Sequence, residues 1–227
     1  MYFDMSYIIL VLPTVIFAMW ASANVSSTYK KYAKVMSKSG YTANDVVRNI
    51  LNAYGLNHIR IEHIAGDLTD HYDPKANVIR LSDSVDGKSS AAAIGVAAHE
   101  AGHAVQHATG YLPIKIRMAI IPVCNLGSTL AVPLVLLGML LSFYPLCYIG
   151  IIAFATATLF QLVTLPVEFN ASGRALAILK NAGLPNEDIN AAKKVLTAAA
   201  LTYVAALATS LASLLRLIFI VNGRNRD

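Results

Sequence analysis

The sequence predicts a mainly α-helical integral membrane protein, with about four transmembrane helices and a cytoplasmic, largely helical portion that contains a small β hairpin or sheet. Hydrophobic residues make up 56% of the 227 residues and charged residues only 14%, against roughly 25% charged residues in an ordinary soluble domain. The mean hydropathy is +0.54. This composition excludes a disordered chain, a collagen and a coiled coil, and it disfavours a water-soluble globule.

The cysteine count and the net charge exclude further classes of protein. Two cysteines are too few for a disulfide scaffold or a cysteine-rich zinc module. A net charge of +5 is compatible with nucleic-acid binding, but in an apolar chain basic residues more often mark the cytoplasmic face of a membrane protein. We therefore expect the lipid bilayer as a partner and no nucleic acid.

Three long stretches without Asp, Glu, Lys or Arg set the predicted membrane spans. A transmembrane helix needs about 20 apolar residues, so the first stretch, 5–29, accommodates one span. The second, 118–167, is too long for one span and is broken near Pro145, which indicates two helices joined by a tight turn. The third begins at 195. The predicted transmembrane helices are residues 6–22, 118–142, 146–167 and 196–221.

The first span is predicted to be an uncleaved anchor, because Asp4 and no basic residue precedes it, the reverse of a signal peptide. Basic residues gather in segments 24–117 and 168–194, which the positive-inside rule places in the cytoplasm, with both termini outside. Basic residues near the end of the chain oppose that placement of the C-terminus, so the direction of the last helix stays open. They are Arg216, Arg224 and Arg226.

Segment 24–117 holds most of the polar chemistry. Residues 42–55 have the capping residues and apolar spacing of a short amphipathic helix. Alternating side chains at 59–63 and 78–81, on either side of a turn, predict two short strands that form an edge pair. Residues 89–109 form an Ala-rich helix with a serine cap and a glycine directly after its end.

The Ala-rich helix contains the sequence HEAGH at 99–103. Residues four apart share one face of a helix, so His99 and His103 can bind one metal ion through their imidazole nitrogens. Glu100 is placed to take a proton from a zinc-activated water and later to deliver it to the leaving amine. Chance gives roughly 0.003 such motifs in a chain of this composition, which favours a zinc site over two structural histidines.

A catalytic zinc ion needs a third protein ligand. Among the four glutamates of the chain, Glu168 ends the long uncharged run at the predicted cytoplasmic mouth of the third span, where a carboxylate is costly without a partner. The alternative ligand is His107, four residues after His103. By helix rise it lies about 6 Å past His103, so one ion cannot easily bind all three histidines. A solvated interfacial charge at Glu168 also stays open.

Several segments resemble the YugP-type membrane zinc metallopeptidases of bacteria. They are SAAAIGVAAHEAGHAVQ at 90–106, LTDHYDP at 68–74, IRLS at 79–82 and LPVEFNAS at 165–172. The resemblance covers nearly the whole chain. More remotely, Glu168 with Ala171 three residues later resembles the HtpX and CAAX prenyl proteases. Those proteins usually have Asp after the alanine, whereas this chain has Ser172, which leaves open what orients the ligand histidines.

The resemblance implies a zinc-dependent endopeptidase, with residues 1–227 as a single membrane metallopeptidase domain that acts on protein or peptide substrates. It implies a gluzincin site in which one zinc ion per chain binds His99, His103 and Glu168, with Glu100 as the general base. The protein would lie in the bacterial plasma membrane as a multi-pass protein whose active site faces the cytoplasm. The identity of the substrate and the oligomeric state stay open.

The resemblance also implies that the strand at 77–82 lies beside the cleft. As an edge strand it would bind an extended peptide as a further strand. The substrate-binding residues would be Val78, Ile79, Arg80 and Leu81. Three further residues are candidates for stabilising the tetrahedral oxyanion: Tyr72, His71 and Arg174.

Two other functions remain as alternatives. One is a site-2-type intramembrane protease with the HEAGH motif inside the bilayer, because residues 89–114 lack Lys and Arg. This stretch is mostly alanine, however, and makes a weak span. The other is a proteolytically inactive, zinc-binding membrane adaptor, against which the intact Glu100 argues. The sequence also predicts no disulfide, because helix rise places Cys124 and Cys147 roughly 28 Å apart.

Overall fold

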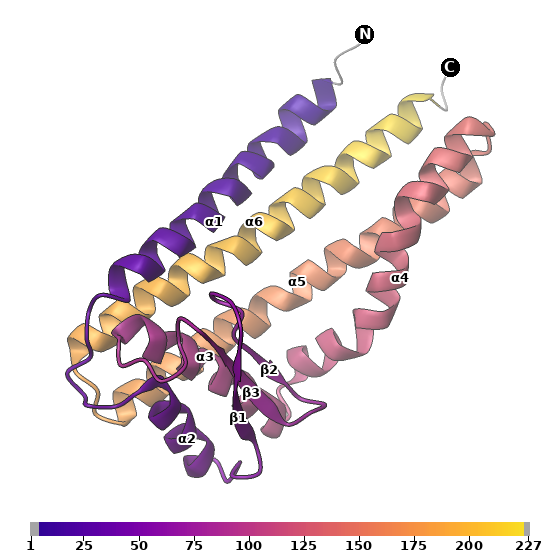
Figure 1. Cartoon of the computed structure of the whole chain (residues 1–227). Coiled ribbons are helices and arrows are strands. Elements are labelled where there is room, and N and C mark those ends of the chain that lie inside the picture. The colour runs from indigo at the N-terminus through magenta and orange to yellow at the C-terminus, as the bar shows by residue number, and fades with distance from the viewer. Residues whose placement is uncertain (1–4, 225–227) are drawn as a thin grey trace. The chain divides into compact units, whose positions relative to one another are not determined.

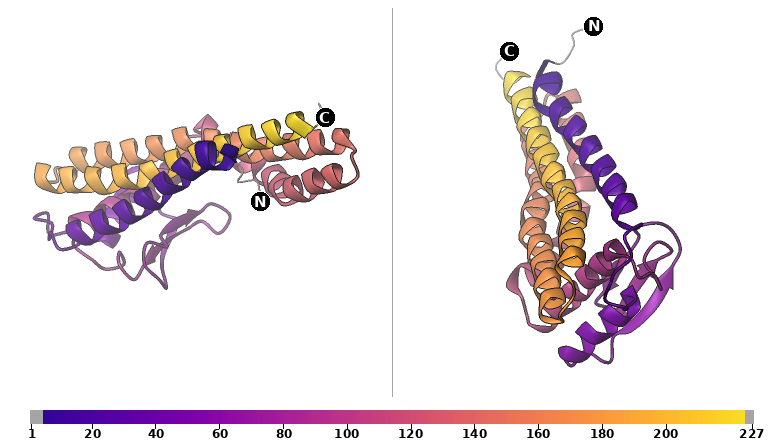
Figure 2. Two further views of the ribbon diagram at one scale, coloured as in Figure 1. Left: turned by 90° about the horizontal axis from the view of Figure 1, so that it is seen from above. Right: turned by 90° about the vertical axis from the view of Figure 1, so that its left-hand side faces the viewer.

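The computed structural model describes residues 5–224 (Figures 1 and 2). Asp4, which supports the predicted uncleaved anchor, and Arg226, which bears on the side of the C-terminus, lie outside this range. The protein is mainly helical and divides into two compact units. The helical unit comprises the described parts of residues 1–22, 115–166 and 201–227. The mixed unit, which also contains a β-sheet, comprises residues 23–114 and 167–200.

Four long helices supply the candidate membrane spans. They are α1 (Leu12–Tyr32), which follows a π-helical turn at Tyr7–Val11, α4 (Leu112–Leu140), α5 (Tyr144–Asn181) and α6 (Asn186–Arg224). Within the described residues these are the four helices long and apolar enough to cross a membrane. The predicted fold class, a mainly helical multi-pass membrane protein with a small sheet, is therefore confirmed.

The helices continue well beyond the spans that hydropathy predicted. Pro166 does not end α5, which runs on to Asn181. A proline removes one backbone donor and clashes with the carbonyl four residues earlier, which bends a helix more readily than it ends a well-packed one. One continuous helix therefore carries both the apolar run and Glu168.

Close helix packing holds the helical unit together. A Cβ added at Gly150 of α5 would lie 2.9 Å from the carbonyl oxygen of Ala131 on α4, so only glycine permits this approach. In the same unit α5 and α6 lie side by side (Figures 1 and 2), and the hydroxyls of Thr158 and Ser210 are 2.8 Å apart. Small and hydroxyl-bearing side chains are what close packing of membrane helices requires.

In the mixed unit, α2 (Ala43–Ala53) begins with a capping box. The Thr42 hydroxyl accepts from the backbone N–H of Asp45, and the Asp45 carboxylate accepts from the backbone N–H of Thr42. The second helix, α3 (Ala91–Ala108), is capped by Ser90, whose hydroxyl accepts from the N–H of Ala93. Both helices agree with the sequence prediction, and their apolar residues share one buried core.

The sheet differs from the predicted edge pair. Its strands are β1 (Arg60–Ile64), β2 (His71–Asp73) and β3 (Val78–Ser82), in the order β1-β3-β2. Strand β3 is parallel to β1 and antiparallel to β2, so it is the central strand. The prediction failed because β2 is short and polar and lacks the alternation that marks a strand.

This topology corrects the predicted substrate-binding strand. Residues 78–80 of β3 pair with β1 on one side and with β2 on the other, which leaves no free edge there for a peptide. The predicted contact residues Val78, Ile79 and Leu81 are fully buried in the core, and Arg80 is half-buried. The expectation of a free edge that pairs with substrate is therefore wrong for Val78, Ile79 and Arg80, while Leu81 pairs with β1 alone and is buried.

Both cysteines lie in the helical unit, and both are expected to remain reduced thiols. The Cys124 thiol donates to the carbonyl of Thr156, and the Cys147 thiol to that of Val135. Val135 and Cys124 are 11 residues apart on α4, or about 16 Å by helix rise, beyond the reach of a disulfide. Intact mass under non-reducing conditions, after alkylation in denaturant, should show two modified thiols. A monomer with an intramolecular bridge would contradict the helix packing.

Candidate metal centre

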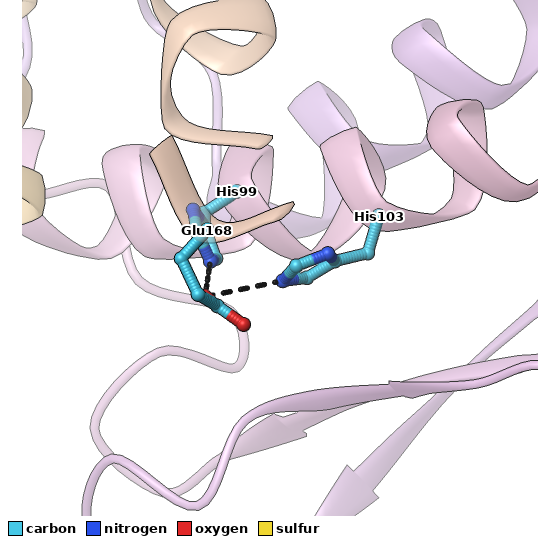
Figure 3. Close-up of side chains that lie close together, drawn as sticks. All are labelled: His99, His103 and Glu168. Atoms are coloured by element: carbon cyan, nitrogen blue, oxygen red, sulfur yellow. Dashed lines mark hydrogen bonds and ion pairs between the residues drawn. The ribbon is translucent and has the colours of Figure 1, made fainter. Parts of the chain in front are cut away.

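Three side chains of the mixed unit converge at one point (Figure 3). His99 and His103 lie on α3, and Glu168 lies on α5. The Nε2 atoms of the two histidines are 3.3 and 3.6 Å from the same oxygen, Oε2 of Glu168. One ligand atom from each residue lies within 4.8 Å of the other two. This spacing allows all three atoms to coordinate one metal ion.

Helix geometry and one glycine create this convergence. Residues 99 and 103 are one turn apart on α3, which puts their imidazoles on one face, with ring centroids 4.7 Å apart. Helix α5 comes very close at Gly102, where an added Cβ would lie 2.8 Å from the backbone oxygen of Ala171. The close contact brings the turn of α5 that carries Glu168 against the histidines.

The three side chains are largely buried, so the charge of each one affects the pKa values of its neighbours. The Glu168 side chain is 3% exposed, and those of His99 and His103 are 14% and 12% exposed. Burial by itself lowers the pKa of His103, but the adjacent carboxylate of Glu168 and the charge of Glu100 outweigh it and raise that pKa. A carboxylate buried this deeply requires a positive partner, either an imidazolium or a metal ion.

The other ring nitrogens of both histidines are also occupied. Nδ1 of His103 is 3.0 Å from Oε1 of Gln106, and Nδ1 of His99 is 3.1 Å from the hydroxyl of Ser172. Ser172 is the residue at which the chain departs from the prenyl-protease pattern. Sequence reasoning missed Gln106. A signal existed, since a glutamine three residues after His103 falls near the same helix face.

Comparison with known proteins identifies the family. The model of the family described as "Putative neutral zinc metallopeptidase" matches residues 7–222. The chain belongs to this family. It is also 46% identical over 225 residues to a curated relative, "Putative membrane protease YugP" of Bacillus subtilis (strain 168), a match that covers 98% of this chain and 100% of the relative. No solved structure matches the chain.

Membership of this zinc metallopeptidase family confirms the predicted resemblance and implies zinc as the metal. The donor set of the cluster fits that ion. Two imidazoles and one carboxylate are a common ligand set of catalytic zinc, which leaves a fourth position open. The carboxylate also supplies negative charge that two neutral imidazoles lack.

Glu100 lies next to the cluster in sequence and is buried, at 8% exposure. Its charge acts on His103 and on the half-buried carboxyl of Asp70, whose pKa is raised mainly by burial and further by Glu100. Asp70 accepts hydrogen bonds from the backbone N–H and the hydroxyl of Ser82. The charge of Glu100 therefore influences both His103 in the cluster and Asp70, which holds the end of β3 through Ser82.

The remaining candidates lie outside the three-residue cluster. His107, the alternative ligand, contacts the ring of Tyr72 edge-on with centroids 6.1 Å apart. His71 bonds through Nε2 to the guanidinium of Arg80. Arg174 donates to Asn170 and stacks over the ring of Tyr111. The oxyanion role of Tyr72, His71 and Arg174 stays a prediction.

The contact at Gly102 gives a testable consequence. Gly102→Ala should force α3 away from α5, which costs about 1–3 kcal/mol as overpacking and weakens zinc binding. The control is Gly173→Ala on α5, because an added Cβ there meets nothing within 4 Å and alanine favours a helix by about 0.5–1 kcal/mol. Thermal unfolding and zinc content of the purified proteins measure both effects. Full zinc binding by Gly102→Ala would show that the helix contact does not support the site.

Proposed function

We propose that the protein is a membrane-embedded zinc-dependent endopeptidase whose HEAGH site faces the cytoplasm. The observation that carries the proposal is the convergence of His99, His103 and Glu168 in a chain that belongs to a zinc metallopeptidase family. Nε2 of each histidine and a carboxylate oxygen of Glu168 would hold the ion. When bound, zinc supplies a Lewis acid that polarises the scissile carbonyl and acidifies water.

Glu100 is the proposed general base. Its carboxylate accepts a proton from the attacking water as the water oxygen bonds to the peptide carbonyl carbon. It then donates this proton to the leaving nitrogen as the C–N bond breaks. The burial of Glu100 excludes most competing bulk water from this proton transfer.

The proposed substrate is an extended segment of protein or peptide. Because β3 is the central strand, β1 and β2 form the two edges of the sheet. The Tyr72 ring of β2 contacts His107 of α3, so this edge lies beside the helix that carries the histidines. A peptide could add to β2 as a further strand through main-chain hydrogen bonds.

The structure favours this proposal over an intramembrane protease of the site-2 type. Helix α3 is not among the described helices that could cross a membrane. Its buried residues belong to the same core as those of α2, β3 and the following loop. The inactive adaptor is distinguished by experiment, because it would bind zinc without cleaving an unfolded substrate.

The central test separates metal binding from catalysis. Glu100→Gln should retain about one zinc ion per chain while hydrolysis of casein falls by at least about a hundredfold, since only proton transfer is lost. Glu168→Ala should weaken zinc binding by more than about a hundredfold and abolish activity, because an inner ligand is removed. Metal content and casein cleavage of the purified, detergent-solubilised chain are the measurements.

The matched controls are two glutamates outside the cluster. Glu62 pairs with Arg60 and Arg80, and Glu187 pairs with Lys38, so Glu62→Ala and Glu187→Ala should keep zinc and activity. If Glu168→Ala binds zinc fully while His107→Ala does not, the third ligand is His107. If Glu100→Gln loses zinc, Glu100 is a ligand or is needed for folding.

The proposed topology treats residues 1–227 as one membrane domain with segments 24–117 and 168–194 in the cytoplasm. Asn57 is exposed in the mixed unit, and Phe143 is 54% exposed in the α4–α5 turn. A membrane-impermeant thiol reagent should label Asn57→Cys only in inverted vesicles and Phe143→Cys only in right-side-out vesicles. The parent chain, whose two cysteines are buried, supplies the background. The opposite labelling pattern would place the site outside the cytoplasm.

A further inference from the structure

We propose that Gln106 is a positioning residue that fixes the tautomer of His103, so that the Nε2 lone pair of this ligand faces the metal position, whereas His99 is not fixed in this way. The inference rests on the proposed zinc site. Its basis is the set of hydrogen bonds around Gln106, a fully buried side chain. Its oxygen is 3.0 Å from Nδ1 of His103, and its nitrogen donates to Val167 and Asn170.

The carbonyl of Val167 determines which way the Gln106 amide points. A backbone carbonyl can only accept, so the group 2.8 Å from it must be the amide nitrogen of Gln106. The amide oxygen must then face His103. Because that oxygen only accepts, Nδ1 of His103 must carry a proton. In the neutral ring this leaves the lone pair on Nε2, the nitrogen that faces Glu168.

A second group enforces the same orientation independently. The Arg174 guanidinium only donates, and its Nε lies 2.8 Å from Oδ1 of Asn170. Since Oδ1 of Asn170 therefore accepts, the Gln106 atom 3.0 Å from it must again be the nitrogen. Val167 and Asn170 flank Glu168 on α5, so one turn of this helix both supplies a ligand and sets the tautomer of another.

His99 is held differently. Its Nδ1 bonds to the hydroxyl of Ser172, and a hydroxyl can either donate or accept. Its Nε2 is within hydrogen-bonding distance of Glu168, at 3.3 Å. Without metal, His99 can therefore place its proton on Nε2 and accept from Ser172 at Nδ1. For a neutral His99 in this form, metal binding requires the proton to move from Nε2 to Nδ1, where the Ser172 hydroxyl then accepts it in a hydrogen bond, whereas a neutral His103 needs no change of tautomer.

A neutral amide suits this position better than the carboxylate often found beside a ligand histidine. The site already contains the carboxylates of Glu168 and Glu100, and a third negative charge in the same buried region would be costly. The amide fixes the proton on Nδ1 without adding charge. Its two N–H groups are satisfied by Val167 and Asn170, so no buried donor is left unpaired.

Substitutions at Gln106 separate tautomer control from simple packing. Gln106→Met removes the acceptor for His103 Nδ1, whereas Gln106→Glu keeps an acceptor but loses the donors to Val167 and Asn170. We expect both variants to lower the melting temperature. Zinc affinity, measured by competition with a chromogenic chelator on the full chain in detergent, should fall about 10- to 100-fold for Gln106→Met and clearly less for Gln106→Glu. The matched control is Gln161→Met, at the other glutamine of the chain, which should bind zinc normally.

An experiment on the unaltered chain covers the case in which the variants fail to fold. In the cobalt(II)-loaded protein, the Nδ1 protons of both ligand histidines give shifted proton NMR signals. The His103 signal should exchange slowly with D₂O, because Gln106 is fully buried, and the His99 signal should exchange faster. Ser172→Ala should alter only the faster signal. The side chains of the two histidines are similarly exposed, at 14% and 12%, so exposure alone predicts equal rates.

The outcomes that overturn the inference are specific. If the loss of zinc affinity is proportional to the loss of melting temperature in both Gln106 variants, Gln106 acts only through packing. Equal exchange rates of the two Nδ1 protons, or a change in the slow signal on Ser172→Ala, also exclude the proposed asymmetry. Failure of the zinc site itself looks different, because the unaltered chain would then bind no zinc, or His103→Ala would bind it as tightly.

Discussion

The burial of the Glu168 carboxylate is the constraint on which the mixed unit depends. A side chain that is 3% exposed cannot keep its charge without a partner, since the loss of hydration costs several kcal/mol or more. The imidazoles of His99 and His103 offer that partnership through Nε2 atoms that lie 3.3 and 3.6 Å from its oxygen Oε2. A divalent ion between the three ligands would compensate the charge more completely and hold α3 and α5 together at this point.

The contacts around the Glu168 carboxylate depend on the close approach of α3 and α5. Gly102 lets the backbones approach because it has no side chain to collide with Ala171. Gln106, one turn along α3, bonds to the backbone of α5 at Val167. Ser172, one turn along α5, bonds back to His99. The site thus depends on how α3 and α5 are aligned, so one added methyl group at Gly102 should alter the spacing of its side chains.

The sequence alone predicted the features with strong local signals. The four long helices follow from uncharged runs, and the pairing of His99 with His103 on one helix face follows from a motif that chance hardly produces. Glu168 was identifiable because a lone carboxylate at the end of a long apolar run needs a partner. The central position of β3 was not predictable, because β2 has three residues and no apolar alternation. The contacts of Gln106 with Val167 and of Ser172 with His99 were not predictable, because they join residues 61 and 73 positions apart in the sequence.

The long sequence distance between the histidines and Glu168 affects how the proposed site is assembled during synthesis. Glu168 follows His103 by 65 residues, and α4 and most of the apolar run of α5 lie between them. At a synthesis rate of about 5–20 residues per second, the histidines leave the ribosome roughly 3–13 s before the carboxylate. In the proposed enzyme the nascent chain therefore holds an incomplete ligand set until its central helical hairpin has been synthesised.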